Sequence, residues 1–266
     1  MTSKGGRAPK HRVLDGSGRL WLFGLHAVRD ALGNPNRVRH RLLVTRNAHD
    51  RLSDAIAGSG IEPEIVDARK FAAPLDPNSV HQGAALQAEP LDWGRLEDLC
   101  APRRDPNPPV VLLDRVTDPH NVGAILRSAE VFGAAAVIAP RHHSAPETGA
   151  LAKAASGALE RQPYLRVRNL GDAMQSLAGF GYALIGLDQN GALPIQEAVD
   201  AAVGPVGLVL GAEGAGMRSR TRELCTTLAR ISAARGLASL NVSNAAAVAL
   251  YAACAGSASP KHRFFE

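Results

Sequence analysis

Apolar residues in this chain of 266 residues fall into short runs, and the runs alternate with segments in which apolar positions recur every three or four residues. Short apolar runs bounded by glycine, proline or polar residues are typical of buried strands, and the wider spacing is typical of amphipathic helices. In the first ninety residues this pattern predicts strands at 20–23, 41–45 and 64–67 and helices at 26–32 and 48–57. Such alternation predicts a small α/β unit.

The second half of the chain repeats the alternation on a larger scale. Its helices are expected to begin near Asn121, at Leu170 and at Val242, where apolar residues follow helical spacing. Its buried strands are expected at 110–113, 136–139, 165–167, 182–187, 206–210 and 228–231. Strands that alternate with helices favour a mostly parallel sheet with helices on both faces.

Composition shifts divide the chain into five segments. We expect a disordered basic tail, a first domain, a polar and proline-rich linker, a second domain and a short C-terminal tail, at 1–17, 18–90, 91–109, 110–258 and 259–266 respectively.

The net charge of +5 fits a polyanionic partner such as RNA, although many proteins are mildly basic. The chain has an odd number of cysteines, and their spacing does not match a metal site; they are Cys100, Cys225 and Cys254. This pattern favours reduced thiols and a cytoplasmic setting. The N-terminus has no apolar core of a signal peptide, and no apolar run reaches the roughly 20 residues that span a bilayer.

A glycine-rich stretch after 206–210 is the first candidate for chemistry. Its glycines at 211, 214 and 216 match neither the dinucleotide fingerprint nor a P-loop. They fit an ordinary tight turn, and they also fit a loop whose backbone faces a small ligand, because only glycine permits such close approach. Two polar residues, Ser239 and Asn241, stand directly before the last predicted helix.

Three segments together resemble the SpoU/TrmH family of RNA ribose 2′-O-methyltransferases, which belongs to the SPOUT superfamily. The sequence Asn-Val-Gly-Ala-Ile-Leu-Arg-Ser-Ala-Glu-Val-Phe-Gly at 121–133 resembles the first family motif. Gly-Ala-Glu-Gly-Ala-Gly at 211–216 resembles the second, and Ile231 with Ser-Leu-Asn-Val-Ser at 239–243 resembles the third. The segments at 24–28 and 81–83 resemble the auxiliary substrate-binding domain of the branch that modifies a guanosine of 23S rRNA, a domain similar to ribosomal protein L30e/L7Ae.

The resemblance implies a fold, a cofactor and a site. The second domain would be a SPOUT α/β domain with a deep trefoil knot, which the pattern of residues alone does not predict because knots are nearly absent from proteins. The cofactor would be S-adenosylmethionine, the partners RNA and a second copy of the chain, and no metal would be needed. The implied cofactor contacts are backbone groups of Gly211, Ile231 and Leu240. The implied catalytic residues are Asn121, Arg127, Glu213, Ser239 and Asn241.

Several of these residues also have a structural interpretation. Asn241 can simply be the N-cap of the last helix, and Arg127 can form an exposed ion pair with Glu130 three residues on. Glu213 fits a role in organising its loop better than a role as general base. Because arginine remains protonated in proteins, we interpret Arg127 as a charged group that grips an RNA phosphate and stabilises the ionising 2′-oxygen.

The chain departs from the family at the third motif, where Ile231-Ser232-Ala233 replaces the usual Ile-Pro-Met. A lost proline loosens the loop, so a weaker affinity for the cofactor is expected. Two alternatives to rRNA methylation therefore stay open: a tRNA 2′-O-methyltransferase, and a knotted RNA-binding protein without transferase activity.

Overall fold

The computed structural model describes residues 18–76, 79–102, 107–232 and 240–256. Their contacts define two compact units, one made of the residues up to Leu91 together with Glu147–Ala150, and one made of the remainder. The predicted boundary at 91–109 stays a prediction; helix α3 (Leu96–Cys100) lies inside that stretch and belongs to the second unit.

The first unit contains a four-stranded sheet in the order β1-β4-β2-β3. Strand β4 pairs antiparallel with both β1 and β2, and β2 pairs parallel with β3. Its elements are β1 (Leu20–Phe23), α1 (Leu25–Gly33), β2 (Arg39–Val44), α2 (Arg46–Ser59), β3 (Pro63–Ile65), the 3₁₀ turn η1 (Ala68–Lys70) and β4 (Ala84–Ala88).

Strand β4 was missed by the sequence pattern although it joins the two halves of this sheet. Its sequence is Ala-Ala-Leu-Gln-Ala, and alanine is depleted in strands. Its alanines and Leu86 are fully buried between two partner strands, so tertiary pairing overrides the weak local preference.

A buried arginine is part of the first unit. Arg37 is 2% exposed, and its guanidinium donates to the carbonyl of Glu89 at 2.6 Å and to the carboxylate of Glu147 at 2.7 Å. A charge removed from water needs such partners to be tolerated. This pair helps explain why Glu147–Ala150 groups with the first unit.

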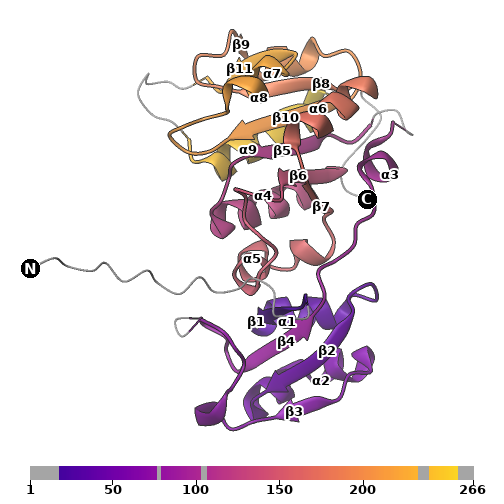
Figure 1. Ribbon diagram of the computed structural model, residues 1–266, viewed down its shortest axis with the longest axis vertical. Helices are drawn as coiled ribbons and strands as arrows, with labels where there is room; N and C mark the ends of the chain where they lie inside the picture. The colour runs from indigo at the N-terminus through magenta and orange to yellow at the C-terminus, as the bar shows by residue number, and fades with distance from the viewer. Residues whose placement is uncertain (1–17, 77–78, 103–106, 233–239, 257–266) are drawn as a thin grey trace, which may run out of the picture. The chain divides into compact units, whose positions relative to one another are not determined.

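The second unit contains a seven-stranded sheet in the order β7-β6-β5-β10-β8-β11-β9, and every pairing in it is parallel (Figure 1). Its strands are β5 (Val110–Asp114), β6 (Ala136–Pro140), β7 (Tyr164–Val167), β8 (Ala183–Leu187), β9 (Leu193–Pro194), β10 (Val206–Gly211) and β11 (Thr227–Arg230). Besides α3, its helices are α4 (Pro119–Val131), α5 (Gly149–Ala155), the 3₁₀ turn η2 (Ala158–Glu160), α6 (Leu170–Gly179), α7 (Ile195–Asp200), α8 (Ser219–Glu223) and α9 (Val242–Gly256). The first two residues of α5 group with the first unit.

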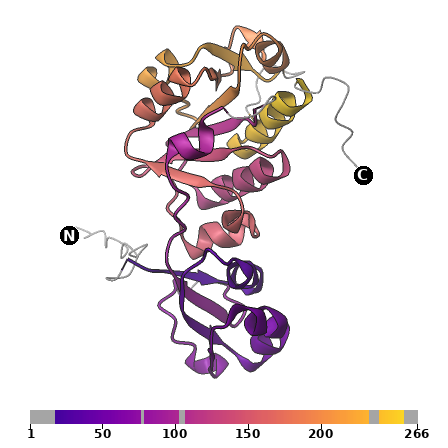
Figure 2. The same cartoon turned by 90° about the vertical axis from the view of Figure 1, so that its right-hand side faces the viewer.

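Helices cover both faces of this sheet. Helices α4 and α7 pack against α9, which lies on β10, whereas α6 packs on β6 and β8 beside α8. Figure 2 shows α9 (yellow) and α4 on one side of the strands. The strands are therefore buried on both faces, which explains why they read as continuous apolar runs.

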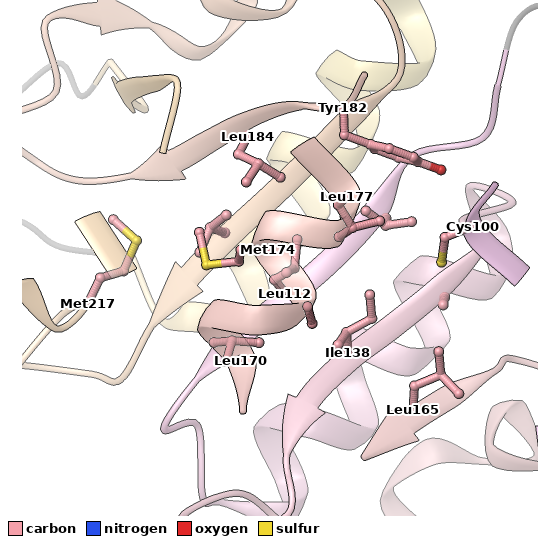
Figure 3. Packing of buried hydrophobic residues seen from close by; sticks show 14 residues of the cluster. Cys100, Leu112, Ile138, Leu165, Leu170, Met174, Leu177, Tyr182, Leu184 and Met217 are labelled. Atoms are coloured by element: carbon pink, nitrogen blue, oxygen red, sulfur yellow. The ribbon is translucent and has the colours of Figure 1, made fainter. Parts of the chain in front are cut away.

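The core beneath α6 shows how the strands contribute to each face. Leu170, Met174 and Leu177 of α6 are almost completely buried and point toward the sheet (Figure 3). Alternate residues of the strands reach the same cluster, among them Leu112 of β5 and Val209 of β10. Their neighbours in the chain point to the opposite face, as the period of two in a strand requires.

The α/β class and the mostly parallel sheet are confirmed. The trefoil knot stays a prediction, because the chain path that would decide it includes 233–239, outside the described residues. The likeness of the first unit to L30e/L7Ae also stays a prediction. The predicted tails at 1–17 and 259–266 also lie outside them. Within the part of the chain that the structure describes, no helix has the length and apolar character needed to cross a membrane.

Candidate active site

The order in which the chain adds strands to this sheet reverses next to β5 and β10, so the carboxyl ends of these two strands lie at a topological switch point. The chain runs from β5 outward to β6 and β7, whereas β10 inserts between β5 and β8. In parallel α/β sheets, ligands bind outside the carboxyl ends of the strands at such a point. Helix α4 follows β5 here, and the glycine-rich loop follows β10.

Three of the predicted catalytic side chains meet at this point. The amide of Asn121 donates to Glu213 Oε1 at 3.1 Å. The amide of Asn241 donates to the same oxygen at 2.5 Å and to Asn121 Oδ1 at 2.9 Å. Residues from α4, the glycine loop and the start of α9 thus form one polar network, with Glu213 and Asn241 exposed to solvent.

Asn241 is also the N-cap of α9. Its Oδ1 accepts from the backbone amide of Ser243 at 2.9 Å and from the Ser243 hydroxyl at 2.5 Å, and its carbonyl accepts from the amide of Ala245. These bonds satisfy amides that the first turn of a helix leaves free. The oxygen of Asn241 therefore caps the helix while its nitrogen contributes to the network, and its catalytic role stays a prediction.

The glycine loop folds back tightly on the end of β10. The Gly216 amide donates to the Ala212 carbonyl at 2.8 Å, and Gly214 and Gly216 have φ of 73° and 66°, which glycine adopts without strain. A Cβ on Gly211 would lie 2.2 Å from backbone atoms of Gly216 and Met217. The loop's own backbone is therefore enough to require glycine at 211.

Asp114, at the end of β5, fixes the far end of this loop. Its carboxylate is completely buried and accepts the Arg218 amide at 2.9 Å, the Arg218 Nε at 2.9 Å and the Arg218 Nη2 at 2.8 Å. The sequence analysis missed Asp114 and Arg218. A signal was available, since Asp114 is the first polar residue after a buried run, at the edge where parallel sheets carry functional groups.

Arg127 does not join the network within one chain. It lies six residues beyond Asn121 on α4, about 9 Å along the axis and about 120° around it. Its side chain is exposed and makes no hydrogen bond or ion pair with any described residue. The alternative interpretation of Arg127, an ion pair with Glu130, is wrong, because Glu130 binds Arg161 instead.

The predicted cofactor contacts lie at the same edge. Gly211 ends β10 and Ile231 follows β11; one strand, β8, separates these two in the sheet, which places them about 10 Å apart. Ile231 is half-buried and Leu240 is 49% exposed. Ser239 lies outside the described residues.

Neither a metal nor a reactive thiol is evident in the part of the chain that the structure describes. No cluster of three or more potential metal ligands occurs there. Burial raises the pKa of the Cys225 thiol to about 11 and that of Cys100 to about 11, so both stay protonated at neutral pH.

Comparison with known families accounts for both units. Residues 108–251 match the SpoU rRNA Methylase family, and residues 21–93 match the family described as RNA 2'-O ribose methyltransferase substrate binding. The chain belongs to the SpoU rRNA methylase family.

Individual relatives match along most of their length. The chain is 36% identical over 240 residues to the 23S rRNA (guanosine-2'-O-)-methyltransferase RlmB of Vibrio vulnificus, covering 88% of this chain and 95% of that protein. It is 38% identical over 237 residues to RlmB of Ralstonia nicotianae, covering 87% and 94%. Among solved structures, the SpoU methyltransferase AviRb of Streptomyces viridochromogenes, in complex with the cofactor AdoMet, superposes with a TM-score of 0.75 at 26% identity, covering 90% of each chain.

The contact between Asp114 and Arg218 makes a stability prediction. Asp114→Ala leaves the Arg218 amide without its acceptor, and we expect the free energy of unfolding in urea to fall by about 1.5–3 kcal/mol. Exchange of the Arg218 amide hydrogen should also accelerate. Asp98→Ala, which removes an exposed carboxylate from the same unit, is the control and should change little. Equal unfolding free energies for the two variants would contradict the role given to Asp114.

Proposed function

We propose that this chain is an S-adenosylmethionine-dependent RNA ribose 2′-O-methyltransferase that acts on a guanosine of 23S rRNA in the cytoplasm. The observation that carries the proposal is the network of Asn121, Glu213 and Asn241, because three separate family motifs converge on it. Relatives named for this activity on 23S rRNA support the choice of substrate. No disulfide joins the cysteines of the described residues, in keeping with a cytoplasmic setting.

The residues present fit the cofactor. Leu240 presents an exposed apolar side chain, and the backbone of the glycine loop after Gly211 has no side chain at its glycines to block approach. Glu213 makes no ion pair with any cation among the described residues, and its carboxylate suits a positively charged sulfonium. Gly211, Ile231 and Leu240 would hold the cofactor, which supplies an electrophilic methyl group when bound.

The network would orient the target ribose. Asn121 and Asn241 each carry an amide that can donate to, or accept from, a ribose hydroxyl. The capping bonds to Ser243 and Ala245 fix the Asn241 side chain and backbone, so its position does not have to be organised when RNA binds. Ser239 would complete this set, as the family resemblance implies.

Arg127 would act as a fixed positive charge. Its exposed guanidinium is free of partners among the described residues and can bind a phosphate beside the target nucleotide. From there it would favour negative charge on the 2′-oxygen as the proton leaves to phosphate or water.

RNA selection is assigned to the first unit. Its match to a substrate-binding family supports this, as do its basic residues on β2, although Arg41 is partly neutralised by Glu64 at 2.6 Å. His81 stacks on Phe71 with ring centroids 4.2 Å apart, and its Nδ1 accepts the Gly83 amide. His81 is thus held in a structural role, which leaves only part of its ring for RNA.

The proposed activity is tested by mapping ribose 2′-O-methylation in RNA from cells with and without the protein. We expect one guanosine of 23S rRNA to lose its methyl group in the cells that lack the protein. Calorimetry with S-adenosylmethionine on the purified protein accompanies the map. A missing methyl group in tRNA would replace rRNA by tRNA as substrate, and an unchanged map with no cofactor binding would favour an RNA-binding protein without transferase activity.

Arg127 variants test the charge role. Arg127→Lys keeps the positive charge and should retain partial methyl transfer, whereas Arg127→Ala should lose almost all of it with cofactor binding little changed. Initial rates with S-adenosylmethionine and 23S rRNA are compared at equal RNA occupancy. If the lysine variant is as inactive as the alanine variant while RNA binding is intact, charge stabilisation fails and a general-base role for Arg127 gains support.

A homodimer built on the second unit is part of the proposal. Val131 of α4 is 75% exposed, and Val248 and Tyr251 of α9 are 40% and 63% exposed on the helix that packs against α4. Val131 lies one turn from Arg127 on the same face of α4. A second copy that covers this face would therefore also approach Arg127. A twofold dimer is the expected assembly, because twofold dimers are the commonest oligomers of proteins.

The dimer is tested by charge at the apolar face. Tyr251→Arg should convert a dimer to a monomer at micromolar concentration, because it buries an unpaired charge in the interface. Light scattering of wild type and variant measures the molar mass. Val203→Arg, at a position 90% exposed after α7, is the matched control and should leave the mass unchanged. A monomeric wild type would count against the interface.

A further inference from the structure

A second, strongly basic pocket lies at the same edge of the large sheet, beside the network. Its volume is about 310 Å³, within the range of small-molecule sites. Arg115, Pro140 and Arg168 are placed at or just after the carboxyl ends of β5, β6 and β7, which are neighbours in the sheet. The other lining residues are His142, His143, Asn169, Leu170 and Arg218.

The charge of this pocket is not neutralised by its lining. Arg115 and Arg168 are exposed and make no hydrogen bond or ion pair with the described residues, and neither do His142 and His143. Arg218 shares its charge with the buried Asp114. No carboxylate is among the lining residues, so two free guanidiniums converge on one concave surface.

The backbone at Arg115 gives a second observation. Arg115 has φ of 63°, and His143, across the same pocket, has φ of 60°. Non-glycine residues adopt this conformation rarely, and glycine adopts it freely. Side chains kept at strained positions tend to be found where their chemistry is used.

We propose that this pocket binds a phosphodiester group of the substrate RNA, at a nucleotide near the one that is methylated. The inference rests on the proposed function and adds to it a contact outside the network of Asn121, Glu213 and Asn241. Arginine forks match the geometry of phosphate oxygens.

The position of the pocket fits one continuous RNA strand. Arg218 lines the pocket and follows Glu213 by five residues in the glycine loop, so the loop borders both places. Strands β10 and β6 are two places apart in the sheet, about 10 Å. One RNA strand laid along this edge can therefore reach both places.

The test measures binding of protein-free 23S rRNA over a series of salt concentrations. Arg168→Ala should weaken binding about fivefold and lower the slope of log affinity against log salt by about one phosphate contact. Arg115→Gly should do the same while leaving the protein at least as stable, because it also relieves the positive φ. Arg168→Lys should recover most of the affinity.

Arg95→Ala is the matched control, since Arg95 is exposed in the same unit, does not line the pocket and forms an ion pair with Glu97. It should leave affinity and slope close to those of the wild type. Wild-type affinity and slope in both Arg115→Gly and Arg168→Ala would overturn the proposal. So would tight binding of inorganic phosphate that both variants abolish without any effect on RNA, since the pocket would then hold a small anion.

Failure of this inference is distinguishable from failure of the proposed function. If the wild type methylates rRNA and the pocket variants bind RNA normally, the pocket assignment alone is wrong. If the wild type binds RNA with a salt slope that the variants reduce but transfers no methyl group, the pocket assignment holds and the transferase activity is wrong.

Discussion

Close approach between the end of β10 and the loop that follows it is the constraint on which the site depends. A side chain at 211 would overlap the backbone of Gly216 and Met217, and the next anchoring point is the Arg218 amide on the buried carboxylate of Asp114. The loop is therefore held at both ends by the two central strands of the sheet. Glu213 lies between these anchors, so its carboxylate is presented to Asn121 and Asn241 from a fixed frame.

Asn241 connects this frame to the last helix. One side chain caps α9 with its oxygen and bonds Glu213 and Asn121 with its nitrogen. A change in the start of α9 would thus be transmitted directly to the polar network, and the same helix carries the exposed residues Val248 and Tyr251 of the proposed dimer face. Helix capping and the geometry of the network are therefore coupled through one side chain.

The parallel sheet brings the polar network and the basic pocket to one edge of the molecule. Carboxyl ends of parallel strands all point the same way, so residues that follow β5, β6, β7 and β10 gather there although they are far apart in the sequence. The polar network lies where β5 meets β10, and the basic pocket extends over β5, β6 and β7. An RNA strand laid along this edge would meet both.

The sequence by itself determined the α/β class, the strands of the large sheet apart from the two-residue β9, and the residues of three motifs. Buried parallel strands read as apolar runs whatever their neighbours, and a motif is visible without a structure. It did not predict β4, whose alanines form a strand only because β1 and β2 pair with them. It also did not predict the contact between Asp114 and Arg218, which arises because β5 and β10 lie side by side. The structure also pairs Glu130 with Arg161, because contacts between separate elements follow from packing and not from spacing in the chain.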